Sequence, residues 1–149
     1  MLSRDLLTAI RSESHRHAPA EDRARRIADL VRTHTGRRWV GVYRVGAGEV
    51  VNLAWSGPGP PAYPRFPADR GLTGAAIASR RSVVSNDVAN DPRYLTAFES
   101  TGSEVIVPVV VDERVVGTLD VEDERVGAFD DGDRAFFEQI AGALGGLYA

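Results

Sequence analysis

Two carboxylate side chains, Asp120 and Glu122, stand two residues apart in a β-rich segment, and Ser103 and Glu104 begin the β-rich segment before it. Side chains alternate along a strand, so Asp120 and Glu122 lie on one face of theirs. Acids that are buried together need a cationic ligand group, an arginine or a shared proton. The alternative is that both acids lie at a solvent-facing strand end, and the residues alone do not decide between the two interpretations.

The amino-acid composition excludes several other kinds of chemistry. All 18 basic side chains are arginine, and the 149 residues include neither lysine nor cysteine. Thiol nucleophiles, disulfides, cysteine-bearing zinc sites and iron–sulfur clusters are therefore impossible in this chain, as are a Schiff-base lysine and the P-loop lysine. Chemistry by His, Asp/Glu, Ser/Thr or Tyr stays open, and so does binding without catalysis.

Three further groups of residues are candidates for a site. Thr73 lies in a Gly-Leu-Thr-Gly segment at an expected helix start, where free N–H groups suit an anion, although tight packing is the commoner role of so short a motif. His15 and His17 are spaced for a metal, but no neighbouring carboxylate pattern supports one, and we expect neither metal nor cofactor. The aromatic residues that would line a ligand cavity, or else anchor the core, are Trp55, Tyr63, Phe66, Tyr94 and Phe98.

Hydrophobic periodicity predicts the elements that position these residues. Helical spacing indicates a short helix over residues 2–10, a polar joint over 12–19, a second helix from Glu21 to near Gly36 and a last helix capped by Asp130. The predicted strands are 39–45, 50–55, 82–85, 104–111 and 114–122. A proline-rich loop is expected over 57–67, a short helix over 71–78 and a loop with a helical turn near 94–98 over 86–101.

This order of elements predicts an α+β fold. The N- and C-terminal helices would cover one face of an antiparallel sheet, and the short helices and loops of residues 57–101 would cover a pocket on the other face. We expect residues 1–19 to form an N-terminal helix and joint, and residues 20–149 to form one domain.

The strand register decides which polar residue joins the two acids. A two-residue turn at Asp112-Glu113 pairs residue 111 with 114, and hence 105 with 120 and 103 with 122. That register places Ser103 beside the acids. Glu104 joins them only if a bulge, for which Pro108 is a candidate, shifts the register, or if Glu104 lies at the frayed start of its strand.

Five short motifs, in this order and spacing, resemble those of GAF domains from about Glu21 onward. Within that family the chain most resembles the free methionine-(R)-sulfoxide reductases, which reduce the free amino acid through cysteine thiolates. The motifs are Trp-Val-Gly-Val-Tyr at 39–43, Gly-Leu-Thr-Gly at 71–74, Ser-Glu-Val-Ile-Val-Pro-Val at 103–109, Val-Gly-Thr-Leu-Asp-Val-Glu at 116–122 and Phe-Asp-Asp-Gly-Asp at 129–133.

The resemblance also implies what this chain lacks. The family's three cysteines fall on Thr73, near Tyr63 and on Ala97, so none is present. The acids that hold the substrate fall on Glu104, Asp120 and Glu122, where the last is usually Asp. A threonine hydroxyl has no redox couple, so we expect no reductase activity. Without cysteine a thioether-linked bilin is excluded, and without lysine the signature of cyclic-nucleotide GAF domains is incomplete.

The charge and the N-terminal segment bear on partners and location. A net charge of −3 gives no electrostatic case for nucleic acid, and no segment approaches the roughly 20 apolar residues of a membrane span. Polar residues interrupt residues 2–10, so we expect no signal peptide and a cytoplasmic location. Residues 1–44 carry ten arginines and five acidic residues, whereas residues 45–149 carry eight arginines and sixteen acidic residues. The two regions are either solvated surfaces or the matching ends of partner subunits.

Three functions remain open on this sequence. The leading hypothesis is a non-catalytic module that binds a small polar molecule in a sensory or regulatory role, and passes its signal to a separate partner. The second is a structural module that forms a homodimer through its terminal helices. The third is an enzyme that uses the pocket carboxylates as general acid and base.

Overall fold

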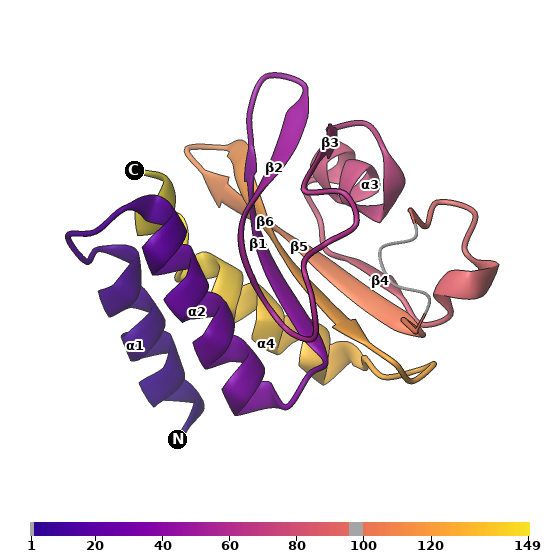
Figure 1. Cartoon of the computed structure of the whole chain (residues 1–149), viewed down its shortest axis with the longest axis horizontal. Helices are drawn as coiled ribbons and strands as arrows, with labels where there is room; N and C mark the ends of the chain where they lie inside the picture. The colour runs from indigo at the N-terminus through magenta and orange to yellow at the C-terminus, as the bar shows by residue number, and fades with distance from the viewer. Residues whose placement is uncertain (1, 96–99) are drawn as a thin grey trace.

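Within residues 2–95 and 100–149, which the computed structural model describes, six antiparallel strands form one sheet in the order β3-β2-β1-β6-β5-β4 (Figure 1). The predicted hairpins are confirmed, whereas β3 corrects the expectation that residues 57–67 are loop throughout. The strands are β1 (Trp39–Val45), β2 (Glu49–Ser56), β3 (Arg65–Pro67), β4 (Val83–Ser85), β5 (Ser103–Val111) and β6 (Arg114–Asp123).

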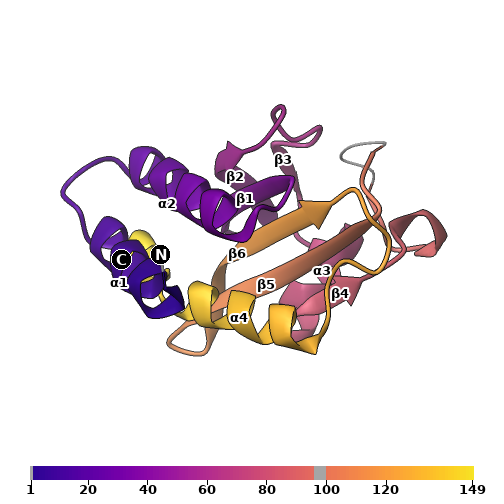
Figure 2. The same ribbon diagram turned by 90° about the horizontal axis from the view of Figure 1, so that it is seen from below.

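Three helices lie on one side of the sheet, as the sequence predicts (Figures 1 and 2). The second and the last pack on the strands, and the first packs against the second. The three helices are α1 (Ser3–Ser14), α2 (Ala20–Thr35) and α4 (Asp131–Gly142), and a 3₁₀ turn, η2 (Gly145–Tyr148), follows α4. The largest apolar cluster lies between these helices and the sheet, and it includes Leu6, Ile27 and Ile140 of the helices with Val121 of β6. The α+β fold class is therefore confirmed. Among the described residues, none of the helices combines the length and the apolar character that a membrane span requires.

The ends of the helices are defined by their sequence. Gly36 follows α2 with a φ of 70°, a left-handed conformation that glycine adopts without a steric penalty. Asp130 caps α4, because its carboxylate accepts a hydrogen bond from the N–H of Asp133 at 2.8 Å. The Asp133 carboxylate in turn accepts from the N–H of Asp130 at 3.0 Å, which completes a capping box and confirms the predicted N-cap.

The opposite face of the sheet carries the cover that the sequence predicts over residues 57–101. The helix α3 (Gly71–Ser79) packs against β5 and β4, where Leu72, Ala76 and Ile106 form a small apolar cluster. A second cluster surrounds Trp39 and Tyr43 of β1. The helical turn expected near residues 94–98 lies partly outside the described residues, and a 3₁₀ turn, η1 (Val88–Asn90), lies earlier in the same connection.

Candidate functional site

A bulge near the start of β6 brings the three acids together. Val111 pairs with Arg114 as predicted, and Val110 pairs with Val115. Val109 then pairs with Gly117 and not with Val116, so the register shifts by one residue between Val110 and Val109. The extra residue is therefore Val116 of β6, and Pro108 is not the bulge.

The shifted register settles which residue stands beside the acids. Glu104 lies directly opposite Glu122, and Ile106 lies opposite Asp120, so the predicted pairing of 103 with 122 is wrong. Ser103 instead donates a hydrogen bond to the carbonyl of Arg125 at 2.5 Å, and it does not line the cavity.

All three acids are withdrawn from solvent. Glu104 is 7% exposed, Asp120 4% and Glu122 2%. The Thr101 hydroxyl donates to Oε1 of Glu122 at 2.7 Å, whereas Asp120 Oδ1 accepts no hydrogen bond of good geometry from a described residue. The interpretation of Asp120 and Glu122 as a solvent-facing strand end is therefore wrong.

Burial shifts the acids toward their neutral forms. The pKa of Asp120 is raised to about 8, mainly because burial removes the carboxyl group from water. The Thr118 hydroxyl lowers this pKa in part, and the charge of Glu122 raises it. Desolvation also raises the pKa of Glu122 to about 7, although the hydrogen bond from Thr101 opposes it. The pKa of Glu104 lies well above its ordinary value, through burial first and then through the charges of Glu122 and Asp120. The cluster therefore shares protons at neutral pH.

The adjacent acid, Asp123, shows what a cationic partner changes. Its side chain points away from the cluster and pairs with Arg37 at 3.1 Å and with Arg125 at 3.2 Å. Burial alone would raise the pKa of Asp123, but the hydrogen bonds from Arg125 and Arg37 lower it to about 2. Among the described residues no arginine or histidine forms an ion pair with Glu104, Asp120 or Glu122. The acid cluster thus lacks the compensating charge that Asp123 has.

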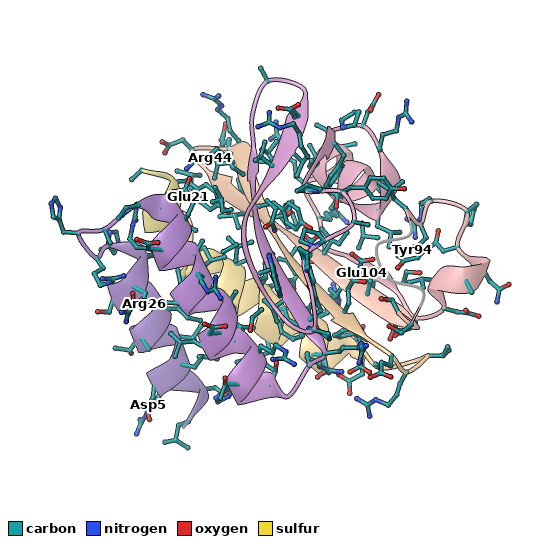
Figure 3. The ribbon with its side chains drawn as sticks, viewed as in Figure 1. Asp5, Glu21, Arg26, Arg44, Tyr94 and Glu104 are labelled. Carbon is teal, nitrogen blue, oxygen red and sulfur yellow. The ribbon has the colours of Figure 1, made fainter. Side chains whose placement is uncertain are left out.

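The cluster forms one wall of a cavity between the sheet and its cover. Figure 3 shows Glu104 and Tyr94 on this side of the sheet. The cavity has a volume of about 40 Å³. The other walls come from β1, the connection after β2, α3 and the segment before residue 96. The predicted residues among its lining are Glu104, Asp120, Glu122, Thr73, Tyr63, Phe66 and Tyr94.

The start of α3 faces the acids across the cavity. Gly71, Leu72 and Thr73 line it, and Thr73 is only 4% exposed. The first N–H groups of a helix have no partner within the helix, and the positive end of the helix dipole lies there. Arg70 stands at the same wall with a side chain that is 69% exposed. The cavity therefore combines a proton-sharing acid wall with a wall that suits negative charge.

Some predicted residues lie elsewhere. Trp55 is half-buried and packs with the cluster around Trp39 instead of lining the cavity, because it pairs with Gly41 one strand further from the acids. Phe98 and Ala97 lie outside the described residues.

Sequence reasoning missed other parts of the site. Tyr43 lines the cavity, and its pKa is raised well above the ordinary value by burial and then by the charges of Asp120, Glu104 and Glu122. Tyr43 pairs with Thr118, which lies two residues before Asp120 in β6. The pairing of β1 with β6 is therefore the signal that would have identified Tyr43 as a cavity residue. Thr101 was also missed, because it precedes the strand.

The histidines give no sign of a metal centre. His15 lies at the joint between α1 and α2 and packs against the backbone of Gly146, where a Cβ would come within 2.4 Å of its ring. His34 lies beside Phe136, with ring centroids 5.9 Å apart. Within the described part of the chain, no group of three or more potential ligands is placed to hold a metal ion.

The sequence profile of the GAF domain matches residues 17–146. The chain belongs to the GAF family. It is 29% identical to GAF domain-containing protein A of Dictyostelium discoideum over 102 residues. The aligned segment covers 68% of this chain and 64% of that protein. It is also 29% identical over 80 residues to the free methionine-R-sulfoxide reductase of Escherichia coli, covering 54% of this chain and 48% of that one. The chain thus spans less than two thirds of the length of both curated relatives.

A solved structure gives a fuller match. The free methionine-R-sulfoxide reductase of Neisseria meningitidis, determined in complex with its substrate, superposes with a TM-score of 0.87. The match has 30% identity and covers 99% of this chain and 88% of that one. The predicted resemblance to GAF domains, and to these reductases among them, is therefore confirmed. This GAF domain contains no cysteine.

Proposed function

We propose that this GAF domain is a non-catalytic module that binds a small zwitterionic molecule in a sensory or regulatory role. The observation that carries the proposal is the cavity wall of Glu104, Asp120 and Glu122, three buried acids without an arginine or histidine counterion among the described residues. An ammonium group placed against this wall would satisfy the acids in their charged form. A carboxylate on the same ligand would meet the start of α3 and Arg70.

Free amino acids are the ligand class that this arrangement favours. Their ammonium and carboxylate groups match the two walls. The similarity to reductases that act on free methionine-R-sulfoxide supports the same class. Reduction by a thiolate is not open to this chain, because it has no cysteine.

Thermal unfolding in the presence of free amino acids, including methionine-(R)-sulfoxide, tests the proposal. We expect at least one amino acid to raise the melting temperature, and its N-acetyl derivative, which lacks the ammonium charge, to have no effect. Asp120→Asn is expected to weaken binding about tenfold or more, because a charge-assisted contact is lost. Asp29→Asn, a matched change at an exposed site on α2, is expected to bind as the unchanged protein does. Equal binding of acetylated and free forms would refute the proposal.

A second candidate is an enzyme that uses the acids as proton donors and acceptors. The pKa values of Glu122 and Asp120, about 7 and 8, favour it because proton transfer is efficient when the pKa of the group is near the working pH. Incubation with each stabilising amino acid, followed by mass spectrometry, separates the two candidates. Unchanged ligand supports the binding module, whereas turnover that Asp120→Asn abolishes supports the enzyme.

Homodimer formation through the terminal helices remains a separate proposal. The mass of the chain in solution, measured by light scattering, tests it. A mass of twice 16.1 kDa supports the dimer, and a mass of 16.1 kDa at all concentrations contradicts it.

A further inference from the structure

The outer edge of β5 is left open where β4 ends. The strand β4 pairs with β5 only at Glu104, Val105 and Ile106, so residues 107–111 have no neighbouring strand on that side among the described residues. Backbone groups along an open sheet edge can pair with an added strand. Pro108 lies within this stretch and offers no N–H, so an added segment would pair with the backbone groups on either side of it.

A groove runs beside this open edge, and we call it the edge groove. It has a volume of about 590 Å³ and lies between the connection after α3, the free part of β5 and the helix α4. Figure 2 shows α4 running along β5. Among the residues that line the edge groove are Arg80, Arg81, Ser82, Val110, Arg134 and Glu138.

The edge groove carries more positive than negative charge. Arg80 and Arg81 are exposed and form no ion pair with a described residue. Arg134 has a loose contact of 3.6 Å with Asp131, whose side chain is almost fully exposed. The acid within the groove, Glu138, accepts a hydrogen bond from the Ser82 hydroxyl at 2.6 Å. Three guanidinium groups therefore face one carboxylate that already has a partner.

Two further features distinguish the edge groove from an ordinary solvated surface. Arg80 adopts a φ of 57° immediately after α3, a position where glycine avoids the steric penalty of a side chain. Val110 is 45% exposed, so an apolar side chain lies among the arginines. A partner that brings both carboxylates and an apolar side chain would cover each of these groups.

We propose that the edge groove docks an extended acidic peptide segment of another protein. The segment would lie along β5 beyond the end of β4, with its carboxylates at Arg80, Arg81 and Arg134 and an apolar side chain over Val110. Since Glu104 and Ile106 of the same strand line the cavity, the docked partner would contact the strand that forms the acid wall.

Fluorescence anisotropy with the full chain and a labelled peptide tests the docking surface. The probe is a peptide of about ten residues that alternates glutamate and valine, and the control peptide alternates lysine and valine. We expect saturable binding of the acidic peptide that weakens as salt is added, and no binding of the basic one. The double variant Arg80→Ala, Arg81→Ala is expected to bind about tenfold more weakly. A matched double variant, Arg4→Ala with Arg25→Ala on the helical face, is expected to change binding less than about twofold.

Amide chemical-shift mapping with the same peptide locates the contact. Shifts confined to residues 80–82, 107–111 and 134–142 support the proposal. The proposal is overturned if the acidic peptide does not bind, if the Arg80 and Arg81 double variant binds it unchanged, or if the basic peptide binds equally well. Complete displacement by inorganic triphosphate without shifts along β5 would also overturn it, because it would indicate a site for small anions alone.

Discussion

Replacing Asp120 with asparagine tests the acid wall through the free energy of unfolding. Burial raises the pKa of Asp120 from 3.8 to about 8 in the folded chain, whereas the unfolded chain returns it to its ordinary value. An acid with a raised folded pKa holds its proton more tightly in the folded state. Stability is therefore greatest below the unfolded pKa of 3.8, falls as the pH rises toward about 8, and is constant above that value.

The size of the effect follows from the interval between the two pKa values. From 3.8 to neutral pH is about three pH units, and each unit costs about 1.4 kcal/mol, so the acid lowers stability at pH 7 by about 4 kcal/mol at most. Because three acids share protons, part of this cost moves to Glu104 and Glu122. Asparagine has nearly the same shape without the charge. We expect Asp120→Asn to stabilise the fold by about 1 to 4 kcal/mol at pH 7.

Urea unfolding at about pH 4 and about pH 7 measures both the gain and its pH dependence. The gain is expected to fall below about 1 kcal/mol at the lower pH, where the wild-type acid is protonated in the folded state and about half protonated in the unfolded state. At neutral pH the expected gain in the free energy of unfolding corresponds to a rise in melting temperature of at least about 3 °C for a chain of this size. Asp29→Asn, at an exposed position on α2, is expected to show no such pH-dependent gain. The raised pKa of Asp120 is contradicted if Asp120→Asn is no more stable than the wild type at pH 7, or if it gains the same stability at both pH values.

Two predictions concern the framework. Asp130→Ala removes the carboxylate that caps the N–H of Asp133, so the free energy of unfolding is expected to fall by about 1 kcal/mol; an unchanged urea midpoint would contradict this. Gly41→Ala places a methyl group 2.4 Å from the buried ring of Trp39, and we expect a loss of about 1 to 3 kcal/mol together with weaker ligand binding. An alanine variant with wild-type stability and affinity would show that the ring can move aside.

Most of the framework was predictable because its signals are local. Alternating side chains placed Asp120 and Glu122 on one face, as the structure confirms, because both acids line the cavity. Turn and cap residues likewise marked the hairpins and the start of α4. These patterns depend on neighbours within a few positions along the chain.

The register was not predictable because its cause is not local. A bulge at Val116 has no distinctive residue type, yet it decides that Glu104 and not Ser103 joins the acids. Trp55 was misplaced for a similar reason, since its distance from the acids depends on β1 lying between β2 and β6. The edge β3 was hidden because proline-rich sequence favours loops, although an edge strand tolerates proline.

Proton release on ligand binding is the most direct test of whether the acid wall binds the ammonium group of an amino acid. Calorimetric titration with the amino acid that most stabilises the fold, in buffers of different ionisation enthalpy at about pH 7, counts the protons exchanged. An ammonium group against Glu104, Asp120 and Glu122 would lower their raised pKa values, so we expect release of about one proton per ligand, and less in Asp120→Asn. Binding with no proton exchange, or with proton uptake, would contradict it.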